Sequence, residues 1–266
     1  MIIDPQSVAL RIQEIAEAQI SPRFGRLESA DIDTKTSPTD LVTIVDREAE
    51  AELERALGDL YPGAGFIGEE SVAADPSLLD GLKSDGAYWI VDPLDGTRNF
   101  VRGHREFGTI VALVVDQEIR MGWLYGIPDS LMCVASAGDG VTINGEKLPA
   151  ALRRDKLIGC RTVGGLAQIH QNELVPKLRS GFETDTLHCS AYAYLKMLGG
   201  EKDFALFGQC APWDHAAGVL SVREAGGVAR YLDNDEAYRP IDTKGRPLLS
   251  APTMDAFDAV AKHLTT

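Results

Sequence analysis

Two carboxylates stand three residues apart where an apolar run ends. Residues 88–91 join two aromatic side chains to two β-branched ones, as in a buried strand, and Asp92-Pro93-Leu94-Asp95 follows. Pro93 cannot continue a central strand, so we expect a turn that holds the two aspartate Cα atoms within about 7 Å. Two anions this close are costly to bury without a cation. Their oxygens and the Leu94 carbonyl suit a hard divalent ion.

The residues after Asp95 could bind a phosphate. Gly96 lets the backbone approach a ligand, and Thr97 opens an expected helical turn whose N–H groups suit an anion. The alternative is a capped turn in which the carboxylates only satisfy backbone amides. This short stretch does not decide between the two interpretations.

Further acidic residues stand at expected strand ends or helix starts. Asp46 is expected at the start of the second helix, and Asp214 at the start of a helix of small residues. Glu69 follows a short strand and is expected to precede a polar loop. Taken singly, Asp46 and Asp214 could be helix caps and Glu69 a solvated strand edge. Their chemical interpretation requires all three to face the turn between Asp92 and Asp95.

Composition limits the classes of protein to consider. The chain has 266 residues, 44% of them hydrophobic, and a net charge of −14. This length allows a large core, and the acidic balance argues against a nucleic-acid or anionic-membrane partner. The four cysteines form no CxxC pair, which favours free thiols, and the sequence shows no signal peptide or transmembrane run. We therefore expect a cytoplasmic protein.

The apolar pattern predicts an α/β protein in two parts. Successive β-forming runs over 109–143, separated by turns, indicate an antiparallel meander. Strands and helices alternate after it. We expect residues 1–150 to form an N-terminal α+β lobe with most of the metal ligands. Residues 151–266 would form a C-terminal α/β lobe that supplies Asp214.

Together and in order, these segments resemble the inositol monophosphatase family of metal-dependent sugar phosphatases. The resemblance runs from about Lys35 to Gly227. It is carried by Lys35…Asp40…Asp46, Gly68-Glu69-Glu70-Ser71, Asp92-Pro93-Leu94-Asp95-Gly96-Thr97 and Pro212-Trp213-Asp214-His215-Ala216-Ala217-Gly218. It implies a layered α/β/α/β/α sandwich, with a central, largely antiparallel sheet and a second, smaller one, in a homodimer. It also implies Mg²⁺-dependent hydrolysis of a phosphomonoester, with two or three bound Mg²⁺ ions or Mn²⁺ in their place. The pocket for the alcohol that the reaction releases would lie in residues 151–266.

The resemblance also implies roles for individual residues. The metal ligands would be Glu69, Asp92, the Leu94 carbonyl, Asp95 and Asp214. The catalytic residues would be Asp46 and Thr97, which orient the nucleophilic water, and Glu69, which supports it. The substrate-binding residues would be Lys35, in a loop that closes the site, and Gly96, Thr97, Ser190, Ala191, Phe207 and Asp214.

Two positions depart from the inositol-specific pattern of the family. Members that act on inositol phosphate carry a Glu seven residues before the Trp-Asp aspartate, where this chain has Phe207. They carry Gly-Ser/Thr-Ala where it has Cys189-Ser190-Ala191. Both changes remove polar contacts to the alcohol, so we predict weak or no preference for inositol phosphate over other small sugar or polyol phosphates.

Several alternatives stay open at this point. Histidinol phosphate, fructose 1,6-bisphosphate and 3′-phosphoadenosine are candidate substrates, and Arg98 and Arg102 could serve the last or simply be solvated. A regulatory binding protein could keep the fold without catalysis, although the intact acidic set argues against this. A thiol enzyme built on His188 and Cys189 is disfavoured, because neighbours in an extended segment point to opposite faces. His215 is expected on a helix surface.

Overall fold

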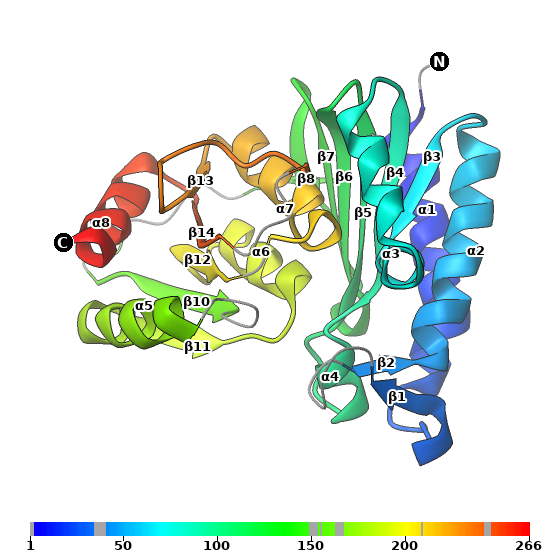
Figure 1. The fold of residues 1–266 in the computed structure, drawn as a ribbon, viewed down its shortest axis with the longest axis horizontal. Coiled ribbons are helices and arrows are strands. Elements are labelled where there is room, and N and C mark those ends of the chain that lie inside the picture. The colour runs from blue at the N-terminus through cyan, green and yellow to red at the C-terminus, as the bar shows by residue number, and fades with distance from the viewer. Residues whose placement is uncertain are drawn as a thin grey trace.

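The computed structural model describes residues 3–34, 41–148, 154, 156–162, 168–208, 210–241 and 246–266. Its elements form five layers, so the predicted α/β/α/β/α arrangement is confirmed (Figure 1). From one side to the other, these are a helix pair, a large sheet, a second pair, a smaller sheet and a third pair. The pairs are α1 (Pro5–Ile15) with α2 (Ile44–Leu60), α6 (Ser190–Leu198) with α7 (Pro212–Glu224), and α5 (Gln168–Gly181) with α8 (Met254–Thr265).

The large sheet has seven strands in the order β3-β4-β5-β6-β7-β8-β9 among the described residues. They are β3 (Gly65–Gly68), β4 (Ala87–Asp95), β5 (Gly108–Val115), β6 (Glu118–Gly126), β7 (Leu131–Ser136), β8 (Gly140–Ile143) and β9 (Glu146–Lys147). Only β3 and β4 pair in parallel here, so the predicted antiparallel meander is confirmed. Asp116 and Gln117 join β5 to β6 with φ values of 51° and 67°, as a tight two-residue hairpin requires.

The smaller sheet has the order β11-β10-β12-β14-β13 in the described part of the chain. Its strands are β10 (Ile158–Thr162), β11 (Glu183–Thr186), β12 (Phe204–Phe207), β13 (Val228–Tyr231) and β14 (Leu248–Ala251). β10 runs parallel to β11 and β12, whereas β14 is antiparallel to β12 and β13. The remaining strands, β1 (Ile32–Thr34) and β2 (Leu41–Thr43), form an antiparallel pair.

Short helical segments complete the chain. α3 (Glu69–Ala74) follows β3, and α4 (Thr97–Val101) follows β4. A π-helical segment, Ala16–Ile20, extends α1, and 3₁₀ turns occur at Ser21–Arg23, Ser29–Asp31, Pro76–Lys83 and Ile127–Asp129. No helix within the described ranges is long and apolar enough to cross a membrane.

Helices α6 and α7 pack between the two sheets and join the two halves of the chain. A Cβ at Gly122 of β6 would lie 2.8 Å from the Cα of Ala217 in α7, so helix and strand are in close contact. One hydrophobic cluster combines Ile90 and Leu124 from the large sheet with residues of α6, α7 and the smaller sheet. Because this core is shared, the expected lobe boundary near residue 150 stays a prediction.

Glycine also lets α7 approach α6. A Cβ at Gly218 would overlap with the ring of Tyr194. That ring is fully buried, stacks on Phe207 at 4.8 Å and has its hydroxyl 3.1 Å from His215 Nδ1, so it has little room to move. Gly58 in α2 differs, because a Cβ there would meet nothing within 4 Å.

These two glycines give a stability prediction. Gly218→Ala should lower the free energy of unfolding by about 1–3 kcal/mol, because the added methyl group overpacks a rigid core. The matched change Gly58→Ala should raise it by up to about 1 kcal/mol, because it improves helix propensity without a clash. Urea denaturation of both variants measures these changes. A stabilised Gly218→Ala variant would contradict the rigid packing of Tyr194.

Candidate metal and phosphate site

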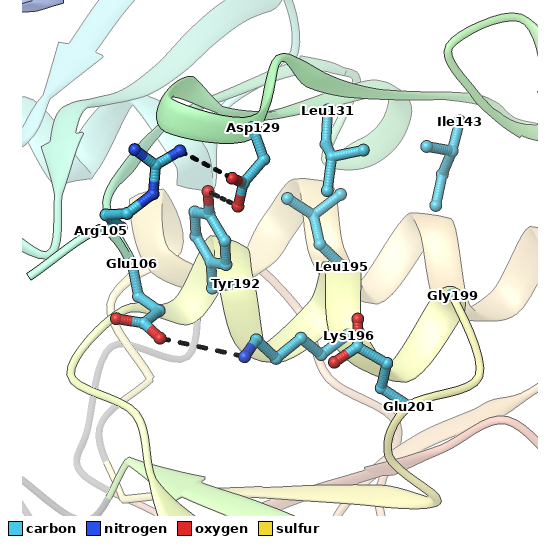
Figure 2. Close-up of a pocket in the computed structure, with 10 residues that line it drawn as sticks. All are labelled: Arg105, Glu106, Asp129, Leu131, Ile143, Tyr192, Leu195, Lys196, Gly199 and Glu201. Carbon is cyan, nitrogen blue, oxygen red and sulfur yellow. Dashed lines mark hydrogen bonds and ion pairs between the residues drawn. The ribbon is translucent and has the colours of Figure 1, made fainter.

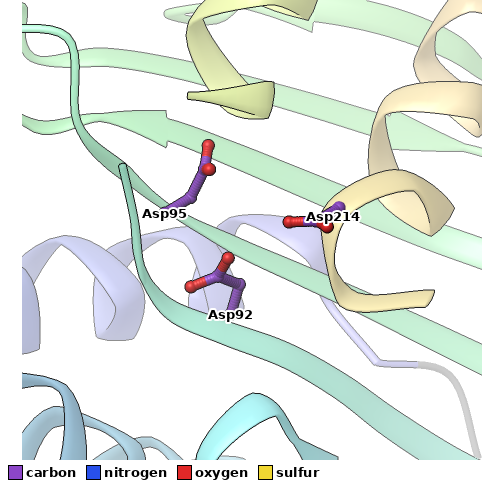
Figure 3. A group of neighbouring side chains, drawn as sticks. All are labelled: Asp92, Asp95 and Asp214. Atoms are coloured by element: carbon purple, nitrogen blue, oxygen red, sulfur yellow. The ribbon is translucent and has the colours of Figure 1, made fainter. Parts of the chain in front are cut away.

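Two aspartates of β4 and a third from α7, distant in sequence, meet at one point (Figure 3). One carboxylate oxygen each from Asp92, Asp95 and Asp214 lies within 4.8 Å of the other two. Asp92 and Asp95 are only 2% and 6% exposed. Negative charges gathered in a poorly solvated place repel one another and favour a bound cation.

The strand that carries two of these aspartates is irregular where they stand. We expected β4 to stop at Pro93, but it continues to Asp95, and its register on β5 shifts between Asp92 and Asp95. Pro93 is accommodated there because an irregular ladder does not require its missing N–H group. The hydroxyl of Thr109 donates to the Pro93 carbonyl at 2.8 Å, and the Leu94 N–H donates to Asp92 Oδ1 at 3.1 Å. These bonds hold the turn that aims both carboxylates.

The carboxylate of Asp95 is bound by the first turn of α6. The N–H groups of Ser190 and Ala191 donate to its two oxygens at 3.0 and 2.6 Å, and the Cys189 thiol donates to Oδ2 at 3.0 Å. A helix N-terminus favours negative charge. Burial nevertheless dominates and raises the pKa of Asp95 to about 6, although the thiol and the two amides partly offset it. Asp95 is therefore held rigidly but is costly to keep ionised without a cation.

Cys189 is a hydrogen-bond donor in this arrangement. Its sulfur also caps α6, accepting a hydrogen bond from the Tyr192 N–H at 3.4 Å. Burial and the nearby charge of Asp95 raise the pKa of the thiol well above its usual value. A neutral, buried thiol is a poor nucleophile, so the structure argues against the thiol-enzyme alternative.

Thr97 and Asp46 form a second group, linked to the turn through the Leu94 carbonyl. The Thr97 hydroxyl lies 2.9 Å from Asp46 Oδ1 and 2.9 Å from the Leu94 carbonyl oxygen, so it can donate to either. Asp46 Oδ2 accepts from the N–H and hydroxyl of Thr43 at 2.8 and 2.6 Å. Burial raises the pKa of Asp46 to about 6. One oxygen of Asp46 thus serves the helix and the other faces Thr97.

The helix starts at Asp46 and Asp214 differ from expectation. α2 begins at Ile44 with Thr43 as its cap, and Asp46 completes a capping box at the third helical position. Asp214 is the third residue of α7, and the cap position belongs to Ala211, which has no capping side chain. Neither aspartate is the helix cap, because each lies one turn further in. Figure 3 shows Asp214 directed toward the other two aspartates.

Glu69 lies close to this centre but outside the group of three aspartates. It is the first residue of α3, where we expected a polar loop. Its charge adds to the rise in the pKa values of Asp46 and Asp95, behind the larger effect of burial. The helix forms because Glu50, a buried residue of α2, binds its first turn.

Sequence reasoning missed Glu50. Its carboxylate accepts the N–H groups of Glu70 and Ser71 at 2.8 Å each, and the Ser71 hydroxyl at 2.5 Å. A Cβ at Gly68 would overlap with this carboxylate, so the glycine leaves room for it. The available signal was spacing, because Glu50 lies four residues after Asp46 on the otherwise apolar face of α2.

The other residues singled out in the sequence lie in a turn, in the core or outside the described part of the chain. Gly96 has φ of +85° and caps α4, and a Cβ there would lie 2.9 Å from the Glu106 carbonyl oxygen. Phe207, predicted on the alcohol side, is fully buried and packs against Tyr194 and His215. His215 is likewise a core residue and not a surface one, since Tyr194 and Phe207 enclose it. Lys35 lies outside the described residues.

The chain matches the model of the Inositol monophosphatase family over residues 5–263. It belongs to this family. It is 29% identical over 235 residues to an inositol-1-monophosphatase of Bacillus subtilis (strain 168), covering 84% of this chain and 86% of that relative. It is 31% identical over 244 residues to inositol monophosphatase 1 of Homo sapiens, covering 86% and 83%. The chain is therefore a phosphomonoesterase of the inositol monophosphatase family.

Solved structures agree with the fold. An IMPase from Thermotoga maritima superposes with a TM-score of 0.80 at 22% identity, covering 97% of this chain and 94% of that one. An IMPase/NADP phosphatase complexed with Mg²⁺ and phosphate gives 0.79 at 21% identity, covering 97% and 92%. At such identities the likeness shows the fold alone.

A cavity of about 310 Å³ lies along α6 (Figure 2). Four of the five charged residues that line it are paired with one another. Asp129 accepts from Arg105 at 3.0 Å and from the Tyr192 hydroxyl at 2.8 Å, and Lys196 lies 3.9 Å from Glu106. The three clustered aspartates are not among the described residues that line it, so it is separate from their cluster.

The raised pKa of Asp95 predicts how metal-free protein responds to pH. A carboxyl whose pKa rises on folding stabilises the folded state when protonated. This contribution is fully present below the ordinary pKa of 3.8 and is lost as the pH rises through about 6. In the presence of a chelator, the free energy of unfolding of the wild type should fall across this window. Asp95→Asn, which cannot titrate, should show a smaller fall in denaturation series at several pH values. Equal slopes would contradict the prediction.

Proposed function

We propose that the chain is a Mg²⁺-dependent phosphomonoesterase that hydrolyses a small phosphorylated metabolite, inositol phosphate or a related sugar or polyol phosphate, with a metal-activated water. The convergence of Asp92, Asp95 and Asp214 is the observation that carries this proposal. Because the chain belongs to this family, we also propose that it is cytoplasmic and that it forms a homodimer.

The donor atoms fit Mg²⁺. The site offers carboxylate oxygens from Asp92, Asp95 and Asp214, with the Leu94 carbonyl and Glu69 as further ligands, and hard cations prefer such oxygens. Burial makes the charges of Asp95 and Asp46 costly, and a divalent ion would relieve that cost. An IMPase/NADP phosphatase of this fold was solved with Mg²⁺ and phosphate, which supports this choice. Two or three ions are proposed, with Mn²⁺ as an alternative.

The metal and the residues around it would have different roles in the reaction. Bound Mg²⁺ would supply Lewis-acid activation of water and charge neutralisation at the leaving oxygen. Thr97 and Asp46 would orient the attacking water, since the Thr97 hydroxyl can pass a proton to Asp46 Oδ1 at 2.9 Å. A carboxylate with a pKa near 6 suits a base at neutral pH. Glu69 would support the same water.

The substrate contacts are proposed on two sides. The N–H groups of Gly96 and Thr97, at the start of α4, and the side chain of Lys35 would hold the phosphate. Asp214 and the start of α6, at Ser190 and Ala191, would face the alcohol.

The part of the site that would face the alcohol of the substrate has few free polar groups to bind the hydroxyls of inositol. The N–H groups of Ser190 and Ala191 already bind Asp95, and Phe207 is buried where inositol-specific relatives carry a Glu. This supports our prediction of weak or no preference for inositol phosphate. Histidinol phosphate, fructose 1,6-bisphosphate and 3′-phosphoadenosine stay alternative substrates, and a non-catalytic regulatory binding protein is the alternative function.

Thr97 variants test the proposal. Thr97→Val removes the hydroxyl between Asp46 and the Leu94 carbonyl, so kcat with Mg²⁺ should fall by about 10²-fold or more. Thr97→Ser keeps the hydroxyl and should retain most of the activity. Phosphate release from a panel of monoesters, with Mg²⁺ and with a chelator, measures these rates and should show no large advantage for inositol phosphate.

Three outcomes of this assay would count against parts of the proposal. Absence of Mg²⁺-dependent phosphate release from every ester would favour the regulatory alternative. Equal rates for Thr97→Val and Thr97→Ser would exclude the hydroxyl from the reaction. Much faster hydrolysis of inositol phosphate than of the other esters would overturn the prediction that the enzyme has weak or no preference for inositol phosphate.

Glu50 gives a further prediction, because it positions Glu69 through α3. In Glu50→Gln, an amide NH₂ replaces one of the two oxygens that accept the N–H groups of Glu70 and Ser71. One of these donors then loses its acceptor, so the first turn of α3 should shift. The Mg²⁺ concentration for half-maximal activity should rise by about 10- to 100-fold, as for other partners of metal ligands. Glu54→Gln, on the exposed face of the same helix, is the control and should leave it unchanged. An unchanged Mg²⁺ requirement in Glu50→Gln would show that α3 does not depend on this carboxylate.

A further inference from the structure

The two carboxylate oxygens of Asp95 are not equally open to a cation. Oδ1 accepts one hydrogen bond, from the Ser190 N–H at 3.0 Å. Oδ2 accepts two, from the Ala191 N–H at 2.6 Å and from the Cys189 thiol at 3.0 Å. A carboxylate offers about four lone-pair sites, two on each oxygen. The start of α6 therefore fills Oδ2 and leaves Oδ1 with room for one more partner.

The Cys189 side chain has little freedom to turn away from Oδ2. Its sulfur accepts the Tyr192 N–H at 3.4 Å, which ties it to the first turn of α6. The residue is only 2% exposed, and a Cβ at Gly96 would lie 3.1 Å from the Cys189 Cβ, so the start of α4 encloses it from the other side. The Asp95 carbonyl oxygen is a second acceptor, but it lies further away, at 3.8 Å, and an ionised carboxylate accepts more strongly. The thiol proton is therefore directed to Oδ2.

The thiol is the one contact of the three that depends on a side chain. The two N–H groups belong to the backbone of α6, so they are present whatever residues stand at 190 and 191. Without the thiol, Oδ2 would accept only the Ala191 N–H and would keep a lone pair. Both oxygens of Asp95 could then bind one ion together. The side chain at position 189 thus decides how many oxygens of Asp95 are open to a metal.

The number of open oxygens matters because divalent cations differ in what they accept. Mg²⁺ requires near-ideal octahedral geometry at about 2.0–2.1 Å, which the narrow O–O spacing of a carboxylate bound through both oxygens distorts. Ca²⁺ is larger, takes about six to eight oxygens in flexible geometry and binds carboxylates through one oxygen or both. One oxygen each from Asp92, Asp95 and Asp214 makes up the group that lies within 4.8 Å. An Asp95 limited to one oxygen therefore suits Mg²⁺ better than Ca²⁺.

We propose that Cys189 is a positioning residue that sets the metal selectivity of the site. Its thiol limits Asp95 to metal binding through Oδ1 alone, and this favours Mg²⁺ over Ca²⁺. Cys189 acts through Asp95 and contacts neither the metal nor the substrate. The inference rests on the metal site of the proposed function and concerns which ion that site prefers.

Titration calorimetry of the chelator-treated full chain with Mg²⁺ and with Ca²⁺ tests this inference without any substrate. In Cys189→Ala, the ratio of the Ca²⁺ Kd to the Mg²⁺ Kd should fall about tenfold, the effect of one hydrogen bond to a charged group. Cys189→Ser keeps a donor at this position, so its ratio should stay within about twofold of the wild type. Cys189→Gly also lacks the donor, and glycine is tolerated at a helix cap, so this variant replaces Cys189→Ala if the latter does not fold.

Two further variants and a second measurement complete the experiment. Cys133→Ala removes another buried thiol, which meets Ser221 Oγ at 3.7 Å two turns along α7 from Asp214, and should change neither Kd. Asp95→Asn identifies the binding heat that depends on this carboxylate. The Ca²⁺ concentration that halves hydrolysis of p-nitrophenyl phosphate at fixed Mg²⁺ should fall about tenfold in Cys189→Ala and stay unchanged in Cys133→Ala and Cys189→Ser.

The outcomes separate this inference from the proposed function. An unchanged Kd ratio in Cys189→Ala and Cys189→Gly would overturn it, and so would an equal loss of affinity for both ions, which would mean that the thiol only supports α6. A Cys189→Ser ratio as low as that of Cys189→Ala would overturn it as well, because the donated hydrogen bond would then not matter. Selective Mg²⁺ binding without phosphate release from any ester would overturn the phosphatase function and leave the role of Cys189 supported. Absence of Mg²⁺ binding in the wild type would overturn both.

Discussion

The placement of like charges in a poorly solvated spot is the constraint that organises this molecule. Asp92 and Asp95 are buried at the end of β4, where their repulsion and desolvation oppose folding. The first turn of α6 meets Asp95 with two N–H groups and a thiol, and the first turn of α7 brings Asp214. The middle layer of the sandwich therefore does more than fill space between the sheets. It presents helix N-termini, with their partial positive charge, to the acidic strand end.

Several residues serve both the fold and the site. Asp46 completes the capping box of α2 with one oxygen and meets Thr97 with the other. Glu50, one turn further along the same helix face, binds the first turn of α3 and so fixes where Glu69 begins. Because these acids lie on the face that packs against the large sheet, the site inherits the rigidity of the core. A flexible loop could not hold the Thr97 hydroxyl between two acceptors in this way.

The meeting of Asp92, Asp95 and Asp214 was predictable because its signals are local. The spacing of Asp92 and Asp95 around Pro93, and the order of the acidic segments, needed no knowledge of distant contacts. The failures all involve tertiary neighbours. Pro93 stays within a strand because β5 tolerates an irregular register, and Glu69 begins a helix because Glu50 reaches it from another element.

Burial was the other property that the linear pattern did not reveal. His215 was expected on a helix surface and Phe207 on the alcohol side, and both are buried, with Tyr194 and each other as aromatic neighbours. The sequence also did not reveal that the backbone N–H groups of Ser190 and Ala191 donate to Asp95. Which side chains point inward depends on how the five layers stack, and a single sequence contains that information only indirectly.

The wide separation of Asp95 from Asp214 along the chain has a consequence during protein synthesis. At about 5–20 residues per second, a ribosome needs on the order of ten seconds to translate the segment between them. For most of that interval the nascent chain carries an acidic turn that neither α6 nor α7 can yet cover. The large sheet must therefore tolerate an uncompensated strand end until the later helices emerge and dock onto it.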